Sequence, residues 1–177
     1  MEIIKPKSLK AGGRVAAVTL SWGGPGLFPK RYEAGKKQFE QAFGLTVIET
    51  AHALADSDWI YSNPEARADD LMSAFEDDSI SGIISTIGGE ESLRILPYLD
   101  LETIRKHPKV FVGYSDTTVS HLACFKAGLV SFYGPAFMSG FAENCGMHAY
   151  LEDSFALGIA AFLVSRLLVV EKPNEER

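Results

Sequence analysis

The most informative stretch of the sequence is Val110-Phe-Val-Gly-Tyr-Ser-Asp-Thr-Thr118. It starts as an apolar strand, ends that strand at Gly113 and presents Ser115 just before a segment with helical character. Such a turn exposes a serine hydroxyl at the carboxyl edge of a sheet and frees the amide of the next residue as a donor. The pattern predicts a nucleophile elbow, although Thr117 replaces the second glycine of a hydrolase elbow. A serine that merely caps the helix is the alternative.

Strand and helix patterns alternate on both sides of this stretch. The predicted strands are residues 14–21, 45–48, 81–87, 109–114 and 130–133. The predicted helices are residues 29–43, which Gly44 closes, a segment that begins at Asn63-Pro64, and residues 93–99, 102–107 and 117–127. This alternation predicts an α/β fold with a doubly wound, mostly parallel sheet in a three-layer arrangement of the Rossmann or flavodoxin kind.

Three loops follow predicted strands: Ser21–Gly26, Gly88–Glu91 and Gly113–Asp116. Because the carboxyl ends of parallel strands share one edge of the sheet, we expect these loops to converge on one crevice. The adjacent glycines at 88 and 89 permit a turn that other residues cannot make and leave amides pointing outward, as an anion or oxyanion site requires. A tight turn that needs glycine for steric reasons alone is the alternative.

Composition narrows the class of protein. The chain has 177 residues with 46% hydrophobic content, which predicts one domain with a packed core. A net charge of −6 with 17 scattered Lys and Arg argues against binding to nucleic acid. Cys124 and Cys145 lack metal-ligand spacing and imply no disulfide framework. We therefore expect a cytoplasmic protein, and no signal peptide is readable at the amino terminus. The sequence implies neither a metal nor an organic cofactor.

The apolar run Phe155–Val170 raises the question of a membrane span. It is shorter than the roughly 20 residues that a spanning helix needs, and it contains Arg166. We therefore expect a buried helix and no contact with a membrane. The polar tail that follows has the composition of a linker. This predicts a domain over residues 1–154, with residues 155–177 as the start of a further domain.

No histidine of this chain is predicted to be the catalytic base. His121 lies six residues after Ser115, so a helix would point it away from the elbow. The remaining histidines have no readable catalytic partner and are His52, His107 and His148. Asp116 is expected to act through its amide, with a carboxylate that caps the following helix.

Four motifs, in this order and spacing, resemble the amino-terminal domain of the LD-carboxypeptidases, serine peptidases of peptidoglycan recycling. They are Leu20–Gly26, Ser85–Gly89, Gly113–Thr118 and Tyr133–Ala136, and the resemblance extends from residue 3 to residue 151. The Ser-Trp-Gly-Gly form of the first motif is most similar to the branch that contains the microcin C immunity protein.

The resemblance implies roles for particular residues. Ser115 corresponds to the nucleophile, and the amides of Gly89 and Asp116 correspond to the oxyanion hole. Candidates for a substrate pocket, from their positions in the same loops, are Trp22, Gly88 and Glu90. The implied substrate is a murein tetrapeptide or a peptidyl or aminoacyl nucleotide, and the full-length family is expected to form homodimers.

The resemblance also implies that a histidine and a glutamate come from a carboxyl-terminal domain about as long as this chain. We therefore expect a fragment or a shortened gene product that has little or no turnover alone, because an unactivated serine is a poor nucleophile. The alternative is a noncatalytic peptide-binding, anion-binding or assembly module in which Ser115 only donates a hydrogen bond.

Overall fold

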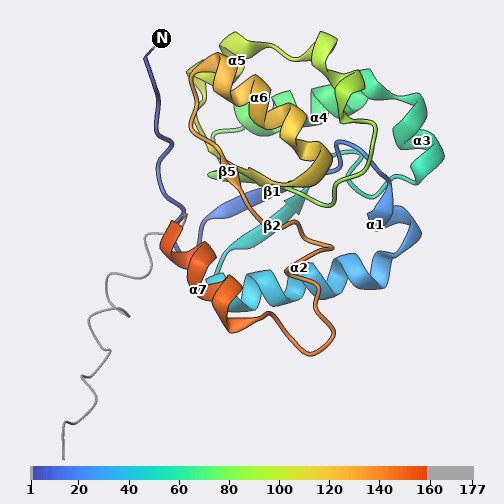
Figure 1. Cartoon of the computed structure of the whole chain (residues 1–177), viewed down its shortest axis with the longest axis vertical. Coiled ribbons are helices and arrows are strands. Elements are labelled where there is room, and N and C mark those ends of the chain that lie inside the picture. Colours follow the sequence, from blue (N-terminus) through green and yellow to red (C-terminus); the bar gives the residue numbers. More distant parts are fainter. Residues whose placement is uncertain (1, 159–177) are drawn as a thin grey trace, which may run out of the picture.

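The computed structural model describes residues 2–158, in which strands and helices alternate along the chain (Figure 1). The strands are β1 (Arg14–Val18), β2 (Thr46–Glu49), β3 (Gly82–Ser85), β4 (Val110–Gly113) and β5 (Phe132–Tyr133). The α-helices are α1 (Gly24–Leu27), α2 (Pro29–Phe43), α3 (Ser57–Ser62), α4 (Pro64–Glu76), α5 (Leu101–Lys106), α6 (Thr118–Ala127) and α7 (Ala149–Gly158). Two short 3₁₀-helices are η1 (Ser92–Tyr98) and η2 (Ser115–Thr117).

The five strands form one parallel sheet in the order β2-β1-β3-β4-β5. Val15 of β1 lies opposite Val47 of β2 and Gly82 of β3, so β1 is paired on both edges. The chain continues to one side of β1 with β2 and to the other side with β3. This reversal leaves a crevice beyond the carboxyl ends of β1 and β3, where open α/β sheets bind ligands. The predicted doubly wound α/β fold is confirmed.

Helices cover both faces of the sheet and make three layers. In Figure 1, α2 and α7 lie on one side of the sheet and α4, α5 and α6 on the other. Side chains alternate accordingly along β1: Val15 and Ala17 join one buried cluster, whereas Ala16 and Val18 join the other. The sheet is therefore buried on both faces, as parallel sheets normally are.

Phe39 of α2 lies at the centre of the core beneath α7. Its ring centroid is 5.0 Å from that of Phe141, 5.3 Å from Phe137 and 5.5 Å from Phe155. Phe155 belongs to α7 and is almost completely buried. The domain boundary expected after residue 154 thus falls within α7, and residues 159–177 lie outside the described residues, so that division stays a prediction.

Local chemistry explains where elements depart from expectation. The helix over residues 29–43 ends as predicted, with Gly44 in the left-handed conformation at φ 62°. The helix expected over residues 93–99 is a 3₁₀-helix that contains Pro97, which has no amide to donate within an α-helix. β5 is shorter than expected because the amide of Val130 donates instead to the carbonyl of Ile4.

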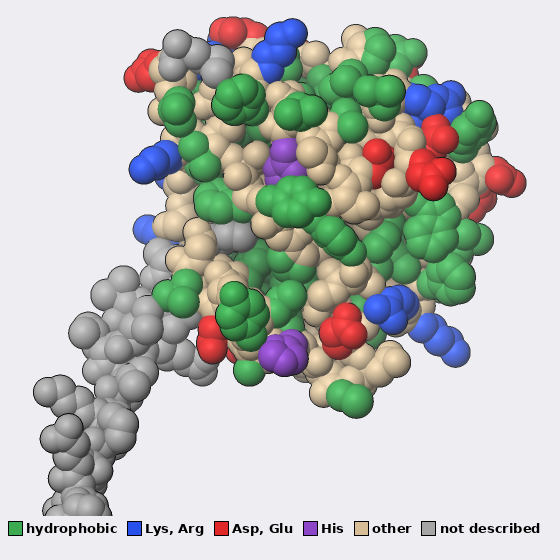
Figure 2. Space-filling model, in the orientation of Figure 1, with side chains coloured by type: hydrophobic (Ala, Val, Ile, Leu, Met, Phe, Trp, Pro, Cys, Tyr) green, Lys and Arg blue, Asp and Glu red, His purple; other side chains and the backbone are tan. Residues whose placement is uncertain are grey.

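Figure 2 shows Lys and Arg scattered over the drawn face rather than gathered into one patch.

None of the helices within residues 2–158 is both long enough and apolar enough to cross a bilayer. Most of the run Phe155–Val170 lies beyond these residues.

Candidate active site

Ser115 occupies a strained turn between β4 and α6. Its φ is +59°, and no other non-glycine residue in the described part of the chain has a positive φ. Such a conformation costs on the order of 1–3 kcal/mol and persists only where its surroundings hold it. The side chain is exposed at the carboxyl edge of the sheet. The predicted strand-turn-helix geometry is therefore present.

Two glycines allow the backbone to pack closely around this turn. A Cβ at Gly88 would lie 2.9 Å from Cβ and 3.0 Å from Oγ of Ser115. A Cβ at Gly113 would lie 2.5 Å from Cγ2 of Thr117. Gly88 thus directly adjoins Ser115, and Thr117, in place of a second glycine, fills the space beside Gly113.

The amides near Ser115 differ in their partners. The amide of Ser115 donates to the hydroxyl of Tyr133 over 3.0 Å. The amides of Gly89 and Asp116 donate to no acceptor within residues 2–158. These are the two amides that the family resemblance assigns to an oxyanion hole, and both are left available for an outside acceptor.

The carboxylate of Asp116 does not cap α6 as expected. The amide at the start of α6 bonds to carbonyls of η2 instead, which frees the Asp116 side chain for neighbouring loops. Its Oδ2 accepts hydrogen bonds from the Ser21 hydroxyl over 2.5 Å and from the Ser92 amide over 2.7 Å. Burial alone would raise the pKa of this carboxyl, but the hydrogen bonds outweigh burial and lower the pKa.

Arg67 of α4 lies completely buried behind these loops. Its Nη1 donates to the carbonyl of Leu20 over 2.8 Å and to that of Glu91 over 3.4 Å. Burial lowers the pKa of the guanidinium, whereas the charges of Glu91 and Asp116 oppose that change. Arg67 is not among the site residues predicted from the sequence, where its position beside the apolar face of a helix is the one signal that marks it.

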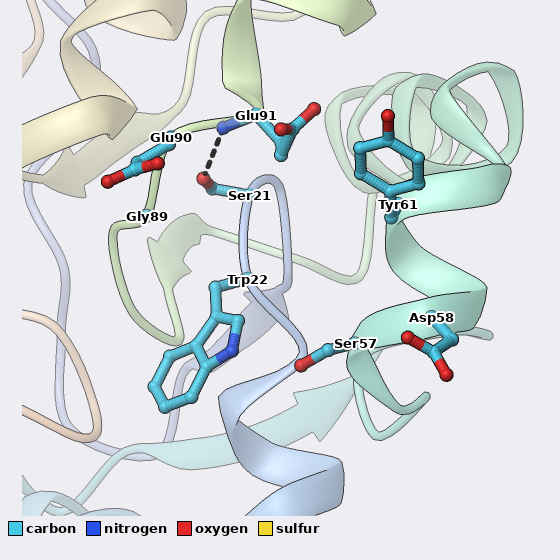
Figure 3. A pocket seen from close by; sticks show the side chains of 8 residues that line it. All are labelled: Ser21, Trp22, Ser57, Asp58, Tyr61, Gly89, Glu90 and Glu91. Carbon is cyan, nitrogen blue, oxygen red and sulfur yellow. Dashed lines mark hydrogen bonds between the residues drawn. The ribbon is translucent and has the colours of Figure 1, made fainter.

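A cleft of about 420 Å³ opens beside the loops after β1 and β3 (Figure 3). It contains two of the three predicted pocket residues, Trp22 and Glu90, together with Gly89. The complete lining is Ser21, Trp22, Ser57, Asp58, Tyr61, Gly89, Glu90 and Glu91. Figure 3 shows the Trp22 ring below Ser21 and the Tyr61 ring to its right, on α3. Gly88 lies against Ser115 instead, outside the lining of this cleft.

The α3 contribution to the cleft was not predicted. Asp56 marks its start, because the carboxylate accepts from the amide of Trp59 over 2.8 Å. Tyr61 in turn holds Arg94, whose guanidinium lies 4.4 Å from the ring centroid. Arg94 also pairs with Glu91 at 3.4 Å, so part of the negative charge at the cleft is already balanced.

His121 supports the backbone of the elbow and not the serine hydroxyl. Its Nε2 lies 2.9 Å from the carbonyl oxygen of Gly113 and its Nδ1 lies 2.8 Å from Oγ of Ser131. Because a carbonyl only accepts, Nε2 carries the proton. Burial lowers the pKa of the ring. The expectation that His121 points away from the elbow is therefore wrong, because its ring contacts the backbone carbonyl of Gly113. The ring makes no hydrogen bond with Ser115.

Other candidate groups are occupied elsewhere. His52 Nδ1 lies 3.0 Å from Oδ1 of the buried Asp70. Cys124 is buried, Cys145 is exposed and both are free thiols. No cluster of three His, Cys, Asp or Glu side chains that could hold a metal ion is found in the part of the chain that the structure describes.

Comparison with known proteins places the site in context. The protein-family model of the LD-carboxypeptidase N-terminal domain matches residues 15–134 of this chain. A Bacillus subtilis protein with the name "Probable murein peptide carboxypeptidase" is 35% identical over 132 residues, which are 74% of this chain and 40% of that protein. The microcin C7 self-immunity protein MccF of Escherichia coli is 42% identical over 90 residues, 50% of this chain and 26% of that protein.

A solved structure agrees with these matches. The crystal structure of an MccF-like protein from Streptococcus pneumoniae in complex with AMP has 38% sequence identity and a TM-score of 0.71. The alignment covers 78% of this chain and 42% of that protein. The present chain thus spans less than half the length of each of these relatives.

Proposed function

Because the chain belongs to the LD-carboxypeptidase family, we propose that it is the nucleophile-bearing domain of a serine peptidase that hydrolyses an amide bond near a free carboxylate. The observation that carries the proposal is the pairing of a strained, exposed Ser115 with two available amides, those of Gly89 and Asp116. A serine displayed in this way suits nucleophilic attack on a carbonyl carbon.

Each group then has a role in the proposed reaction. Oγ of Ser115 attacks the carbonyl carbon as a base removes its proton, and the carbonyl oxygen becomes an oxyanion. The amides of Gly89 and Asp116 donate to that oxyanion, and each such donor contributes roughly 3 kcal/mol to lowering the barrier. The amine then leaves with a proton, and water hydrolyses the acyl-enzyme.

The base is proposed to come from the carboxyl-terminal domain that the family resemblance implies, as a histidine oriented by a glutamate. The nearest histidine along the chain, His121, is engaged with Gly113 and Ser131. We therefore propose that residues 1–177 by themselves have little or no turnover.

The proposed substrate is a murein tetrapeptide or a peptidyl or aminoacyl nucleotide. The name of the Bacillus relative supports the first, and MccF and the AMP complex of the Streptococcus relative support the second. We further propose that the protein acts in the cytoplasm and that its full-length form is a homodimer.

The test is covalent labelling of residues 1–177 with a fluorophosphonate, followed by intact mass and peptide mapping. We expect a slow adduct on Ser115 that added imidazole, as an external base, accelerates. Ser115→Ala abolishes the adduct, whereas Ser73→Ala, which removes an exposed serine of α4, keeps it.

Hydrolysis of an LD-tetrapeptide and of an aminoacyl nucleotide is measured in parallel. Failure of Ser115 to react even with imidazole would contradict the proposed nucleophile and favour a noncatalytic binding module. Steady hydrolysis by residues 1–177 that disappears in Ser115→Ala would support the nucleophile and overturn the expected inactivity.

A further inference from the structure

Asp116 brings two chemically different groups to the loops around the elbow. Its amide is one proposed oxyanion donor, whereas its Oδ2 accepts from the Ser21 hydroxyl over 2.5 Å and from the Ser92 amide over 2.7 Å. We infer that this carboxylate is a positioning group, which sets where the amide of Gly89 lies relative to the amide of Asp116. The inference rests on the proposed function, because it concerns the geometry of the oxyanion hole.

The link from the carboxylate to Gly89 passes through Ser21. A Cβ at Gly89 would lie only 2.4 Å from Oγ of Ser21, so the backbone of Gly89 rests directly on that hydroxyl. The same Oγ accepts from the amide of Glu91 over 3.1 Å, the bond dashed in Figure 3. Since Oγ donates its one proton to Asp116, the carboxylate orients the hydroxyl on which residues 89–91 pack.

Arg67 joins the same two loops from behind. Its guanidinium donates to the carbonyls of Leu20 and Glu91, the residues immediately before Ser21 and Ser92. The loops after β1 and β3 are thus bridged twice, by a buried cation through their carbonyls and by Asp116 through a hydroxyl and an amide. The attraction between the opposite charges of Arg67 and Asp116 also favours keeping these two loops together.

Asp100 offers a matched comparison with a purely structural carboxylate. At the start of α5 it accepts from the amide of Glu102 over 2.9 Å and from the hydroxyl of Thr103 over 2.8 Å. Asp116 likewise accepts one amide and one hydroxyl. Asp100→Asn therefore measures what losing such a set of hydrogen bonds does to stability, without touching the loops around Ser115.

The test measures the affinity of phenylboronic acid, which forms a tetrahedral adduct on a serine Oγ and so mimics the oxyanion intermediate. We expect Asp116→Asn to weaken this affinity by on the order of tenfold or more, since misplaced donors lose their effect steeply. Asp100→Asn is expected to leave the boronate affinity unchanged, although it lowers the thermal stability about as much as Asp116→Asn does. Ser21→Ala weakens this affinity similarly, and Ser21→Ala with Asp116→Asn is less than additive, as for groups acting as one unit.

Two outcomes separate this inference from the proposed function. If the boronate binds through Ser115 but Asp116→Asn and Asp100→Asn bind it equally, the positioning role is wrong while the nucleophile stands. If the boronate does not attach to Ser115, the proposed function fails. Amide NMR then still decides the inference, because Asp116→Asn must shift the Gly89 resonance and speed exchange at Glu91, and an unchanged Gly89 resonance overturns it.

Discussion

The amide of Ser115 donates a hydrogen bond to the hydroxyl of Tyr133 over 3.0 Å, which ties the turn after β4 to the neighbouring edge strand β5. The strained φ of Ser115 needs such support, because its backbone would otherwise relax toward a common conformation. Tyr133 therefore holds the turn from outside the set of residues to which the family resemblance assigns a role.

Tyr133→Phe tests this contact. Loss of this hydrogen bond is expected to destabilise the reactive conformation of the turn by about 1 kcal/mol. We therefore expect Ser115 to react with a fluorophosphonate roughly fivefold more slowly in the presence of imidazole. Tyr150→Phe removes the hydroxyl of another exposed tyrosine and is expected to leave the rate unchanged. Equal rates in both variants would show that Tyr133 does not hold the turn.

Gly88→Ala places a methyl group 2.9 Å from Cβ and 3.0 Å from Oγ of Ser115. One of the two segments must move, so we expect labelling of Ser115 to fall by on the order of a hundredfold while circular dichroism still reports a folded α/β domain. Gly158→Ala, where an added Cβ meets no atom of residues 2–158 within 4 Å, is the control. Unchanged labelling of Gly88→Ala would contradict this tight packing.

Phe39→Ala removes the ring at the centre of the aromatic cluster. The cavity it leaves between Phe137, Phe141 and Phe155 is expected to lower the free energy of unfolding by about 3–5 kcal/mol, measured by urea denaturation. Phe125→Ala is the matched control, because this side chain is 68% exposed and its loss leaves no cavity. Similar losses in the two variants would mean that Phe39 is not central to the core.

Asp116→Asn should also change how stability depends on pH. Folding lowers the pKa of this carboxyl, so its ionised form stabilises the native state above its ordinary pKa of about 3.9. That contribution is lost as the pH falls through the lower pKa of the folded state. The stability difference between wild type and Asp116→Asn is therefore expected to be largest near neutral pH and to shrink below about pH 4.

Unfolding by urea at a series of pH values measures this difference. Asp69→Asn, which removes an exposed carboxylate of α4, is the control for loss of one negative charge at the surface. If the difference between wild type and Asp116→Asn stayed constant through the acid range, the hydrogen bonds to Oδ2 would not favour its ionised form.

The elements that the sequence predicted well carry local signals. The helix of residues 29–43 ends at a glycine, and the short apolar runs around residues 14–18, 82–85 and 110–113 are typical of buried strands. α3 escaped notice because its six residues show little periodicity, although Asp56 provides an N-cap. The shortening of β5 depends on the amide of Val130 pairing with Ile4, a contact between residues far apart in the chain.

The fold class, the turn that carries Ser115 and the tight turn at Gly88 and Gly89 could all be predicted from the sequence, because backbone conformation and residue size are local properties. Two features became apparent only in the folded chain: the carboxylate of Asp116 reaches Ser21 and Ser92 rather than its own helix, and Arg67 bridges the same loops. Hydrogen bonds between loops that are 24 to 95 residues apart depend on how the sheet brings strand ends together, which no local pattern encodes.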